Sequence, residues 1–294
     1  MFAPLPKVAE SRTHPVTPEK VALGKKLFFE KLLSKQGDLS CNSCHDLAKY
    51  GMDGTAVSSG HLGRQGLRNA PTVYNAALHL AQFWDGRAKD VEDQALGPFL
   101  EPGEMAMRGQ EQAITLLRES KEYPLLFQQA FPEDKDPVSF VNIGLAIGAF
   151  ERTLLTPSRF DQFLSGNESA LTEGEKNGLA AFVTVGCTNC HRGVAVGGGM
   201  FQKVGVVKPY LNQDVGRYAV TKKEADFQVF KVPSLRNVEK TAPYFHDGSI
   251  ASLSEAVTLM GRHQLGLELT AEQVESVVTF LKSLTGELPN FTDK

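Results

Sequence analysis

Residues 41–61 read CNSCHDLAKYGMDGTAVSSGH, beginning with the pentad Cys41-Asn42-Ser43-Cys44-His45 and ending on His61, which follows a glycine. A Cys-x-x-Cys-His pentad is the attachment signal of a c-type haem, because its two thiols add to the porphyrin vinyl groups as thioethers. The histidine of the pentad lies under the ring, where its imidazole ligates the iron. The sixth position on the iron is then open, and His61 is near enough along the chain to reach it.

The pentad occurs a second time, as Cys187-Thr188-Asn189-Cys190-His191, and the two copies use all 4 cysteines of the chain. Cys-x-x-Cys alone is also typical of zinc knuckles, redox dithiols and disulfides. A zinc site built from the cysteines would leave the trailing histidines, His45 and His191, without a role. The sequence therefore predicts two covalently bound haem c groups, one at each pentad.

The composition is that of a globular protein, with 41% of the 294 residues hydrophobic and 22% charged. This length suits two domains of ordinary size. The formal net charge of -3 gives no general attraction to nucleic acid. The best apolar run, residues 141–150, includes two glycines and is too short to span a membrane.

The N-terminus, Met1-Phe2-Ala3-Pro4-Leu5-Pro6, lacks the basic region and the following apolar region of a signal peptide. Haem attachment to such pentads normally takes place outside the bacterial cytoplasm. We therefore expect a periplasmic protein, in the form of a mature or trimmed chain whose export signal has already been removed.

Helix signals recur along the chain, and few stretches alternate with the period of two that is typical of strands. Thr17-Pro18-Glu19 predicts a helix start, with a capping hydroxyl followed by proline at the first position. The capping boxes Thr172-x-x-Glu175 and Thr270-x-x-Gln273 predict two more helices, and Gly286 is expected to close the last of them. The predicted class is mainly α.

A faint internal repeat precedes the two pentads. Gly24 and Phe28 lie four positions apart before the first pentad, and Gly178 and Phe182 do the same before the second. A helix followed by the pentad is how a cytochrome c domain begins. We therefore predict two tandem cytochrome c-like domains, 1–160 and 161–294, which meet among loop-forming residues.

The two irons differ in their candidate sixth ligands. His61 follows the first pentad, and the glycines around it would let it approach or leave the iron. No histidine lies close after the second pentad, but Met260 follows in Thr258-Leu259-Met260-Gly261. Because methionine ligation raises the reduction potential of a haem, we expect one low-potential and one high-potential haem. The competing methionines, and the histidines expected at the surface or in loops, are Met1, Met52, Met105, Met107, Met200, His14, His79 and His263.

Short motifs beyond the pentads run in order along nearly the whole chain. They are Gly60-His61, Arg68-Asn69-Ala70-Pro71-Thr72, Gln82-Phe83-Trp84-Asp85-Gly86-Arg87-Ala88, Gln94, Glu104-Met105, Thr241-Ala242-Pro243-Tyr244-Phe245-His246, Met260, Gln264-Leu265-Gly266 and Ser283-Leu284-Thr285-Gly286-Glu287. Together with the pentads, they resemble the bacterial dihaem cytochrome c peroxidases. The resemblance implies two facing cytochrome c-like α domains, usually assembled as a homodimer, in an enzyme that reduces hydrogen peroxide to two waters.

The resemblance also implies different tasks for the two haems. The haem of the first pentad would be the peroxidatic one, with His45 as proximal ligand and His61 as a removable distal ligand. The haem of the second pentad would be the electron-entry centre, ligated by His191 and Met260. Reduction of this second haem would release His61 and open the peroxide site. The electrons would come from a small c-type cytochrome or a copper protein of the cupredoxin type.

Three further residues match positions that take part in the reaction. Trp84, the only tryptophan, matches the residue between the haems, Glu104 matches the distal acid–base carboxylate, and Gln94 matches its polar neighbour. The resemblance also implies a calcium ion at the domain interface, because oxygen-only ligation suits a hard cation. Its matching ligands are Asn69, Thr241 and Pro243, the last two through backbone carbonyls.

Two alternatives stay open from the residues. A dihaem electron carrier without enzymatic activity would keep both irons six-coordinate and would not need Glu104 or Gln94. A relative of the dihaem oxygenase MauG would have tyrosine at the position of Met260, so the methionine favours the peroxidase. His246 lies in a matching motif, but the sequence assigns it no role.

Overall fold

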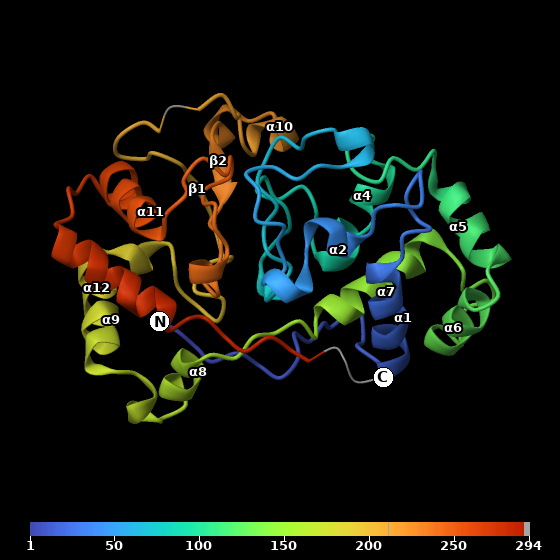
Figure 1. Cartoon of the computed structure of the whole chain (residues 1–294), viewed down its shortest axis with the longest axis horizontal. Helices are drawn as coiled ribbons and strands as arrows, with labels where there is room; N and C mark the ends of the chain where they lie inside the picture. Colours follow the sequence, from blue (N-terminus) through green and yellow to red (C-terminus); the bar gives the residue numbers. More distant parts are fainter. Residues whose placement is uncertain (211, 291–294) are drawn as a thin grey trace.

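The computed structural model describes residues 1–210 and 212–290, which form two mainly helical lobes side by side (Figure 1). The α-helices of the described residues are α1 Pro18–Phe29, α2 Cys41–Cys44, α3 Val91–Gln94, α4 Gly97–Leu100, α5 Gln110–Glu119, α6 Tyr123–Ala130, α7 Phe140–Glu151, α8 Arg159–Leu164, α9 Glu173–Val185, α10 Tyr218–Thr221, α11 Leu253–Met260 and α12 Ala271–Lys282. Strands β1 Phe201–Lys203 and β2 Val229–Lys231 pair antiparallel, with Gln202 opposite Phe230. The expectation of a mainly helical protein is therefore confirmed.

The helix starts expected from the sequence are confirmed. The Thr17 hydroxyl accepts a hydrogen bond from a backbone N–H in the first turn of α1. Thr172 and Thr270 form complete capping boxes at the starts of α9 and α12. Each cap satisfies backbone donors that the helix itself cannot satisfy.

The first lobe, on the right in Figure 1, is built on the contact between α1 and α7. A Cβ atom at Gly24 would lie 1.8 Å from the carbonyl oxygen of Ala146, so glycine is what allows the two helices to lie this close. Phe28 packs edge-on against Phe150 with ring centroids 5.5 Å apart. These residues belong to a buried apolar cluster that extends to Leu154.

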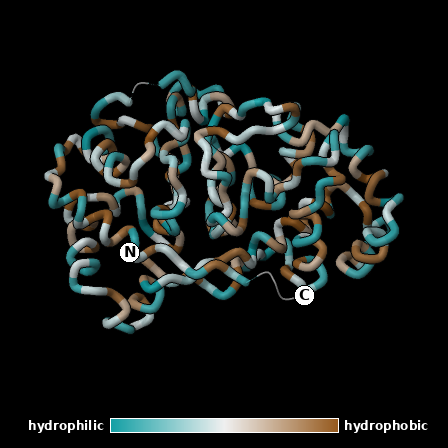
Figure 2. Tube along the Cα trace, viewed as in Figure 1, coloured by the Kyte–Doolittle hydropathy of each residue, from teal (hydrophilic) through white to brown (hydrophobic). Residues whose placement is uncertain are grey.

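The second lobe repeats this contact with α9 and α12. A Cβ atom at Gly178 would lie 2.2 Å from the carbonyl oxygen of Ser276, and Phe182 packs against Phe280 with centroids 5.2 Å apart. The apolar cluster of this lobe begins at Phe160. The glycine–phenylalanine repeat in the sequence is therefore a repeated helix–helix contact, and Figure 2 shows hydrophobic segments inside both lobes.

The prediction that Gly286 closes the last helix was wrong. Helix α12 ends at Lys282, and Gly286 lies beyond it, where its N–H donates to Oδ1 of Asn237 at 2.9 Å. A Cβ atom at Gly286 would lie 2.0 Å from the carbonyl oxygen of Thr156. Glycine is required there by the close passage of two chain segments, rather than by the end of the helix.

The two ends of the described chain cross between the lobes (Figure 1). Phe2 lies in the second lobe, edge-on to Phe160 with centroids 5.4 Å apart. Leu288 packs against the apolar cluster of the first lobe, after Gly286 has formed an antiparallel bridge with Ser158. Each lobe is therefore completed by a segment from the far end of the sequence.

Ion pairs and hydrogen bonds hold the facing sides of the lobes together. Arg68 donates to both carboxylate oxygens of Asp214, at 2.6 and 2.8 Å, and to Asp85 at 2.7 Å. Arg217 of the second lobe donates to the backbone carbonyl of Asp85 at 2.9 Å. Arg68 and Asp85 come from the first lobe, and Asp214 and Arg217 come from the second. This network therefore holds together the two facing surfaces between which the candidate site lies.

Candidate active site

The first pentad forms one helical turn. Cys41 and Cys44 begin and end α2, so their thiols project from one face, and the N–H of His45 closes the turn on the carbonyl of Cys41 at 2.9 Å. All the cysteines are free thiols. Burial raises the pKa of Cys41 to about 12, which keeps this thiol neutral. In the described residues no three His, Cys, Asp or Glu side chains form a cluster that could hold a metal ion. Two thiols on one face of a single turn fit thioether attachment to one porphyrin.

The histidines of both pentads are suited to ligate iron. Burial lowers the pKa of His45 below its usual range and that of His191 to about 4, so both imidazoles are neutral. Nδ1 of His45 lies 3.4 Å from the carbonyl oxygen of Gly51. A proton on Nδ1 that is donated to this carbonyl leaves Nε2 of His45 free to ligate a metal.

His61 lies in a narrow loop that extends from the lobe. Ser59 and Gln65 form an antiparallel bridge across the base of the loop. The tip is open to solvent, with 69% of Leu62 exposed, whereas His61 itself is only 5% exposed. Its Nδ1 atom has no hydrogen-bond partner in the described part of the chain. The loop thus presents a buried imidazole from an exposed segment.

The structure brings His61 and Glu104 together. The backbone N–H of His61 donates to the carbonyl oxygen of Glu104 at 2.8 Å. A Cβ atom at Gly60 would lie 1.9 Å from the carbonyl oxygen of Gly103, so this glycine serves the close contact between the two segments. Burial raises the pKa of the Glu104 carboxyl above its usual range, although the Arg87 guanidinium opposes the shift. The main chain of the candidate distal ligand is therefore joined to that of Glu104, whose carboxyl is more easily protonated than that of an exposed glutamate.

Gln94 is the last residue of α3 and is half-buried. Helix α3 packs against α7, which fixes the position of Gln94 in the first lobe. None of the hydrogen bonds of His61 and Glu104 described above involves Gln94. Its expected place as the polar neighbour of Glu104 stays a prediction.

The second pentad opens onto a cavity between the lobes. Cys187, Cys190 and His191 line it together with Met260, the last residue of α11. A π-helical turn follows directly after Met260, and such turns are frequent at functional sites. The structure therefore brings the candidate methionine to the pentad, although it lies far along the chain. The polar side chains on the cavity wall are those of Asn69, Thr72, His79, Trp84, Gln202, Lys231, Ser234, Thr241, Tyr244, His246 and Gln264.

Trp84 joins the two lobes. Its indole Nε1–H donates to the carbonyl oxygen of Asn69 at 2.8 Å, and its own carbonyl accepts from the N–H of Lys231 at 2.7 Å. Its ring faces that of His246 edge-on, with centroids 6.3 Å apart. The N–H of Asn69 donates to the carbonyl of His246 at 2.8 Å. The tryptophan thus lies where the first lobe meets the wall of the cavity at the second pentad.

His246 is the counterpart of Trp84 in the second lobe, which the sequence reading did not find. Phe83-Trp84-Asp85-Gly86 and Phe245-His246-Asp247-Gly248 share the pattern Phe-x-Asp-Gly. In both copies the phenylalanine and the glycine have positive φ, and an antiparallel bridge closes the loop. The repeated tetrapeptide was the signal in the sequence that could have identified His246.

The three residues expected to bind calcium line the same cavity. Asn69 is 6% exposed, and its side-chain amide donates to the carbonyl oxygen of Thr55 at 2.9 Å. Thr241 and Pro243 come from the second lobe, line the same cavity and have backbone carbonyls that could serve as ligands. These are oxygen donors of the kind that a hard cation accepts, but they include no carboxylate. The calcium ion stays a prediction.

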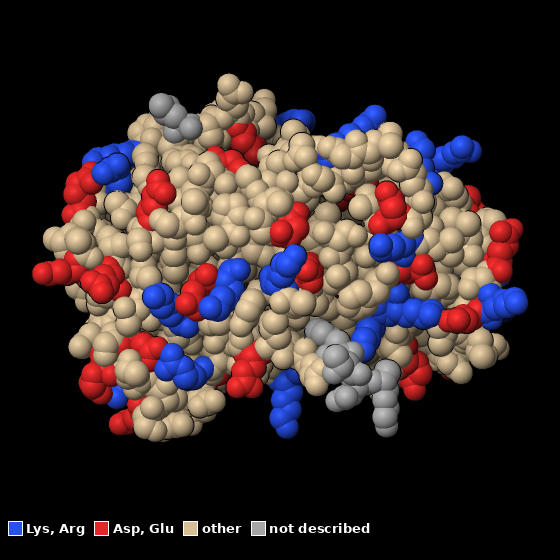
Figure 3. All heavy atoms as spheres, viewed as in Figure 1, with Lys and Arg blue, Asp and Glu red and all other residues tan. Residues whose placement is uncertain are grey.

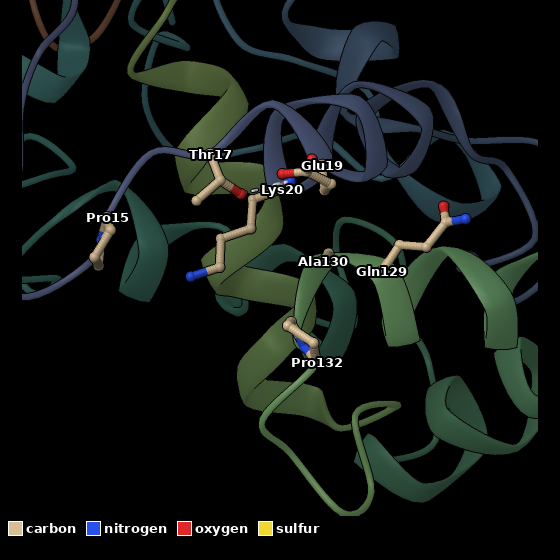
Figure 4. A pocket seen from close by; sticks show the side chains of 7 residues that line it. All are labelled: Pro15, Thr17, Glu19, Lys20, Gln129, Ala130 and Pro132. Carbon is tan, nitrogen blue, oxygen red and sulfur yellow. Dashed lines mark hydrogen bonds between the residues drawn. The ribbon is translucent and has the colours of Figure 1, made fainter.

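A second hollow lies on the surface of the first lobe, between the start of α1 and the end of α6 (Figure 4). Lys20 and Glu19 from α1 face Gln129 and Pro132 across it. The lining includes no histidine or cysteine, so we assign this hollow no part in haem chemistry.

Over the face drawn in Figure 3, basic and acidic side chains are intermixed. No helix of the described residues is long and apolar enough to cross a membrane.

The comparisons with known proteins decide the family. The family model described as di-haem cytochrome c peroxidase matches residues 18–169. The chain belongs to the di-haem cytochrome c peroxidase family. It is 49% identical to the cytochrome c551 peroxidase of Nitrosomonas europaea, over 94% of this chain and 84% of the relative. It is 46% identical to the cytochrome c551 peroxidase of Pseudomonas aeruginosa, over 98% of this chain and 85% of the relative.

More distant relatives of this family member include the methylamine utilization protein MauG of Methylorubrum extorquens, which is 33% identical over 95% of this chain and 82% of the relative. A solved MauG-like protein associated with microbial copper homeostasis is 30% identical and has a TM-score of 0.85, covering 96% of this chain and 94% of that one. The closer agreement with the named peroxidases establishes the chain as an enzyme of the cytochrome c peroxidase class.

Proposed function

We propose that this peroxidase reduces hydrogen peroxide to two waters at the haem of the first pentad, with two electrons that enter at the haem of the second pentad. The reaction, H2O2 + 2 electrons + 2 protons giving two waters, needs a group that moves protons as well as a source of electrons. When bound, the haems supply the iron that binds peroxide and the redox chemistry that stores electrons. We propose residues 1–160 and 161–294 as the two haem domains.

Glu104 is the proposed acid–base residue. Its carboxylate takes a proton from one oxygen of peroxide and delivers it to the other, which makes the second oxygen a good leaving group. Burial raises the pKa of this carboxyl, so protonation is less costly than for an exposed glutamate. Gln94 is proposed to orient the peroxide or the carboxylate as a neutral hydrogen-bonding partner.

His61 is proposed as the gate of the peroxide site. The observation that supports the proposal best is the 2.8 Å hydrogen bond between His61 N–H and the carbonyl of Glu104, because it joins the removable ligand to the acid–base segment. The exposed tip of the loop can move without disturbing the apolar cluster of the lobe. When the imidazole leaves, it makes room beside Glu104 for a small substrate.

Trp84 is proposed to connect the two haems. Its indole donates to Asn69 of the first lobe, and its carbonyl accepts from Lys231 of the second, so a shift in one lobe is transmitted to the other. We further propose His191 and Met260 as the ligands of the electron-entry haem, and a calcium ion held by Asn69, Thr241 and Pro243. A homodimer, a periplasmic location and a small c-type cytochrome or cupredoxin as electron donor complete the proposal.

A stopped-flow experiment tests this function. The protein with both haems attached is reduced by one electron and mixed with hydrogen peroxide, and the absorbance of both haems is followed. We expect rapid oxidation of the second haem and consumption of peroxide, whereas the fully oxidised protein should react slowly. If the half-reduced protein did not consume peroxide, the chain would be an electron carrier and not a peroxidase.

A further inference from the structure

Lys231 is a buried cation in the wall of the cavity at the second pentad. It is 4% exposed, and the strand on which it lies, β2, is buried at all its positions. Its ammonium donates to the carbonyl oxygen of Ala81 at 2.9 Å and contacts Nδ1 of His79 at 3.3 Å. Both partners are neutral, and within the described residues no carboxylate forms an ion pair with Lys231, although the charge of Asp85 acts on it from further away. Burial lowers the pKa of Lys231 to about 8, and the Asp85 charge only partly opposes this shift, so an anion close to the ammonium would stabilise its charged form.

Lys231 also determines which nitrogen of His79 holds the proton. An ammonium group can only donate, so Nδ1 of His79 must accept and the ring proton must be on Nε2. Burial lowers the pKa of His79 well below its usual range, so the ring is neutral. Nε2 is inaccessible to solvent and has no hydrogen-bond partner in the described part of the chain. The Nε2–H group is therefore a buried donor that requires an acceptor.

The position of His79 is fixed by the chain around it. A Cβ atom at Gly198 would lie 2.3 Å from Cδ2 of His79, so glycine leaves room for the ring. The N–H of Leu80 donates to the carbonyl of Gly198 at 2.9 Å. His79 lies in a loop, as the sequence predicted, but its ring faces inward. The ring extends from the first lobe into the cavity at the second pentad.

The kind of anion that suits this pair follows from its chemistry. His79 and Lys231 line the cavity that also contains Cys187, Cys190 and His191, and Lys231 is the only lysine or arginine among the described residues that line it. A haem attached at this pentad carries two propionate carboxylates, which are acceptors with negative charge. We propose that Nε2–H of His79, supported by Lys231, donates a hydrogen bond to a propionate of the second haem and thereby raises the reduction potential of that haem.

The direction of the effect follows from electrostatics. A propionate charge near the iron opposes the addition of an electron, and a hydrogen-bond donor backed by a cation offsets that charge. Removal of either residue therefore favours the oxidised haem. This inference rests on the proposed haem at the second pentad, but it does not require that the protein turns over peroxide.

The test is a spectroelectrochemical titration of the protein with both haems attached. We expect His79→Leu and Lys231→Met each to lower the ratio of reduced to oxidised second haem by about tenfold at a fixed potential, a shift of roughly 59 mV for one electron. His79→Gln, which keeps an amide donor, should stay close to the parent. Lys203→Met is the matched control, because Lys203 is an exposed lysine on the neighbouring strand β1.

Resonance Raman spectra of the propionate bending modes give a second measurement, and they should shift in His79→Leu but not in Lys203→Met. Unchanged potentials and unchanged propionate modes in both His79→Leu and Lys231→Met would overturn the inference. If these variants failed to attach haem, a potential of His79→Gln far below that of the parent would equally contradict it. If the parent did not turn over peroxide but the potentials of His79→Leu and Lys231→Met shifted as expected, only the proposed function would be refuted.

Discussion

The N–H of His61 and the carbonyl oxygen of Glu104 lie 2.8 Å apart, so the proposed gate and the proposed acid–base residue are joined through the main chain. This contact does not depend on the identity of either side chain. Substitution of the imidazole or of the carboxylate should therefore leave the two segments in place. The chemistry of each group can be tested separately.

His61→Gly should make the fully oxidised protein react with peroxide without prior reduction. The substitution removes the imidazole that must otherwise leave, and the backbone N–H that holds the loop remains. The measurement is the initial rate of peroxide consumption by oxidised protein. His263→Gly is the control, since His263 belongs to the second lobe, where its Nδ1 lies 2.9 Å from the carbonyl oxygen of Lys208. Equal rates for His61→Gly and the parent would mean that ligand release does not control access.

Glu104→Gln should retain the absorbance spectra of both haems but lose most peroxide turnover. General acid–base catalysis contributes about a hundredfold to ten-thousandfold, and an amide cannot transfer the proton. Steady-state turnover with a reduced small redox protein measures the loss. Glu111→Gln is the control, because Glu111 is an exposed carboxylate in the first turn of the neighbouring helix α5. Normal turnover in Glu104→Gln would remove this residue from the mechanism.

Gly178→Ala should destabilise the protein by about 1–3 kcal/mol, because the added methyl group overlaps the backbone carbonyl of Ser276 and α9 must move away from α12. Gly174→Ala, on the same helix, should instead stabilise it by about 0.4–1 kcal/mol, since its methyl group would meet nothing closer than 3.9 Å. Urea unfolding of the protein with both haems attached compares the two. A destabilisation of equal size in both variants would contradict the proposed close contact.

The buried ion pair of Asp161 and Arg236 should make stability fall in acid. Burial raises the pKa of Asp161, but the paired Arg236 guanidinium and the neighbouring donors outweigh this and hold the pKa below its usual range. Because the folded state has the lower pKa, the pair stabilises the protein fully above the unfolded pKa. This contribution is lost as the pH falls through the pKa of the folded state.

Asp161→Asn should therefore cost roughly 3–5 kcal/mol at neutral pH, because it leaves a buried guanidinium unpaired, and it should remove this part of the acid sensitivity. Urea unfolding at a series of pH values below 5 is the measurement. Asp136→Asn is the control, since its pair with Arg118 is exposed and should contribute about 0–1 kcal/mol. A parent and an Asp161→Asn variant with parallel pH profiles would show that the pair does not titrate as expected.

The parts of this fold that could be predicted from the sequence are those set by neighbouring residues. The pentads and the capping boxes are local patterns, and the structure places each box at a helix start. The role of Gly286 could not be predicted in this way, because the carbonyl of Thr156 approaches it only after folding. For the same reason Lys231 reads as an ordinary charged residue in the sequence, whereas in the folded chain it is buried and its ammonium contacts His79 and Ala81 of the first lobe.

The crossed chain ends described above give the molecule the plan of a swapped pair fused into one polypeptide. Phe2 fills the half that contains the second pentad, and Leu288 returns to the half that contains the first. Cutting the connection between the halves would consequently not release two cytochromes that fold independently. Each half would lack the terminal segment, containing Phe2 or Leu288, that packs into it from the far end of the sequence. Both ends of the described chain thus cross the boundary between the lobes. The distance between the two redox centres is therefore held by these crossing segments as well as by the contacts between the lobe surfaces.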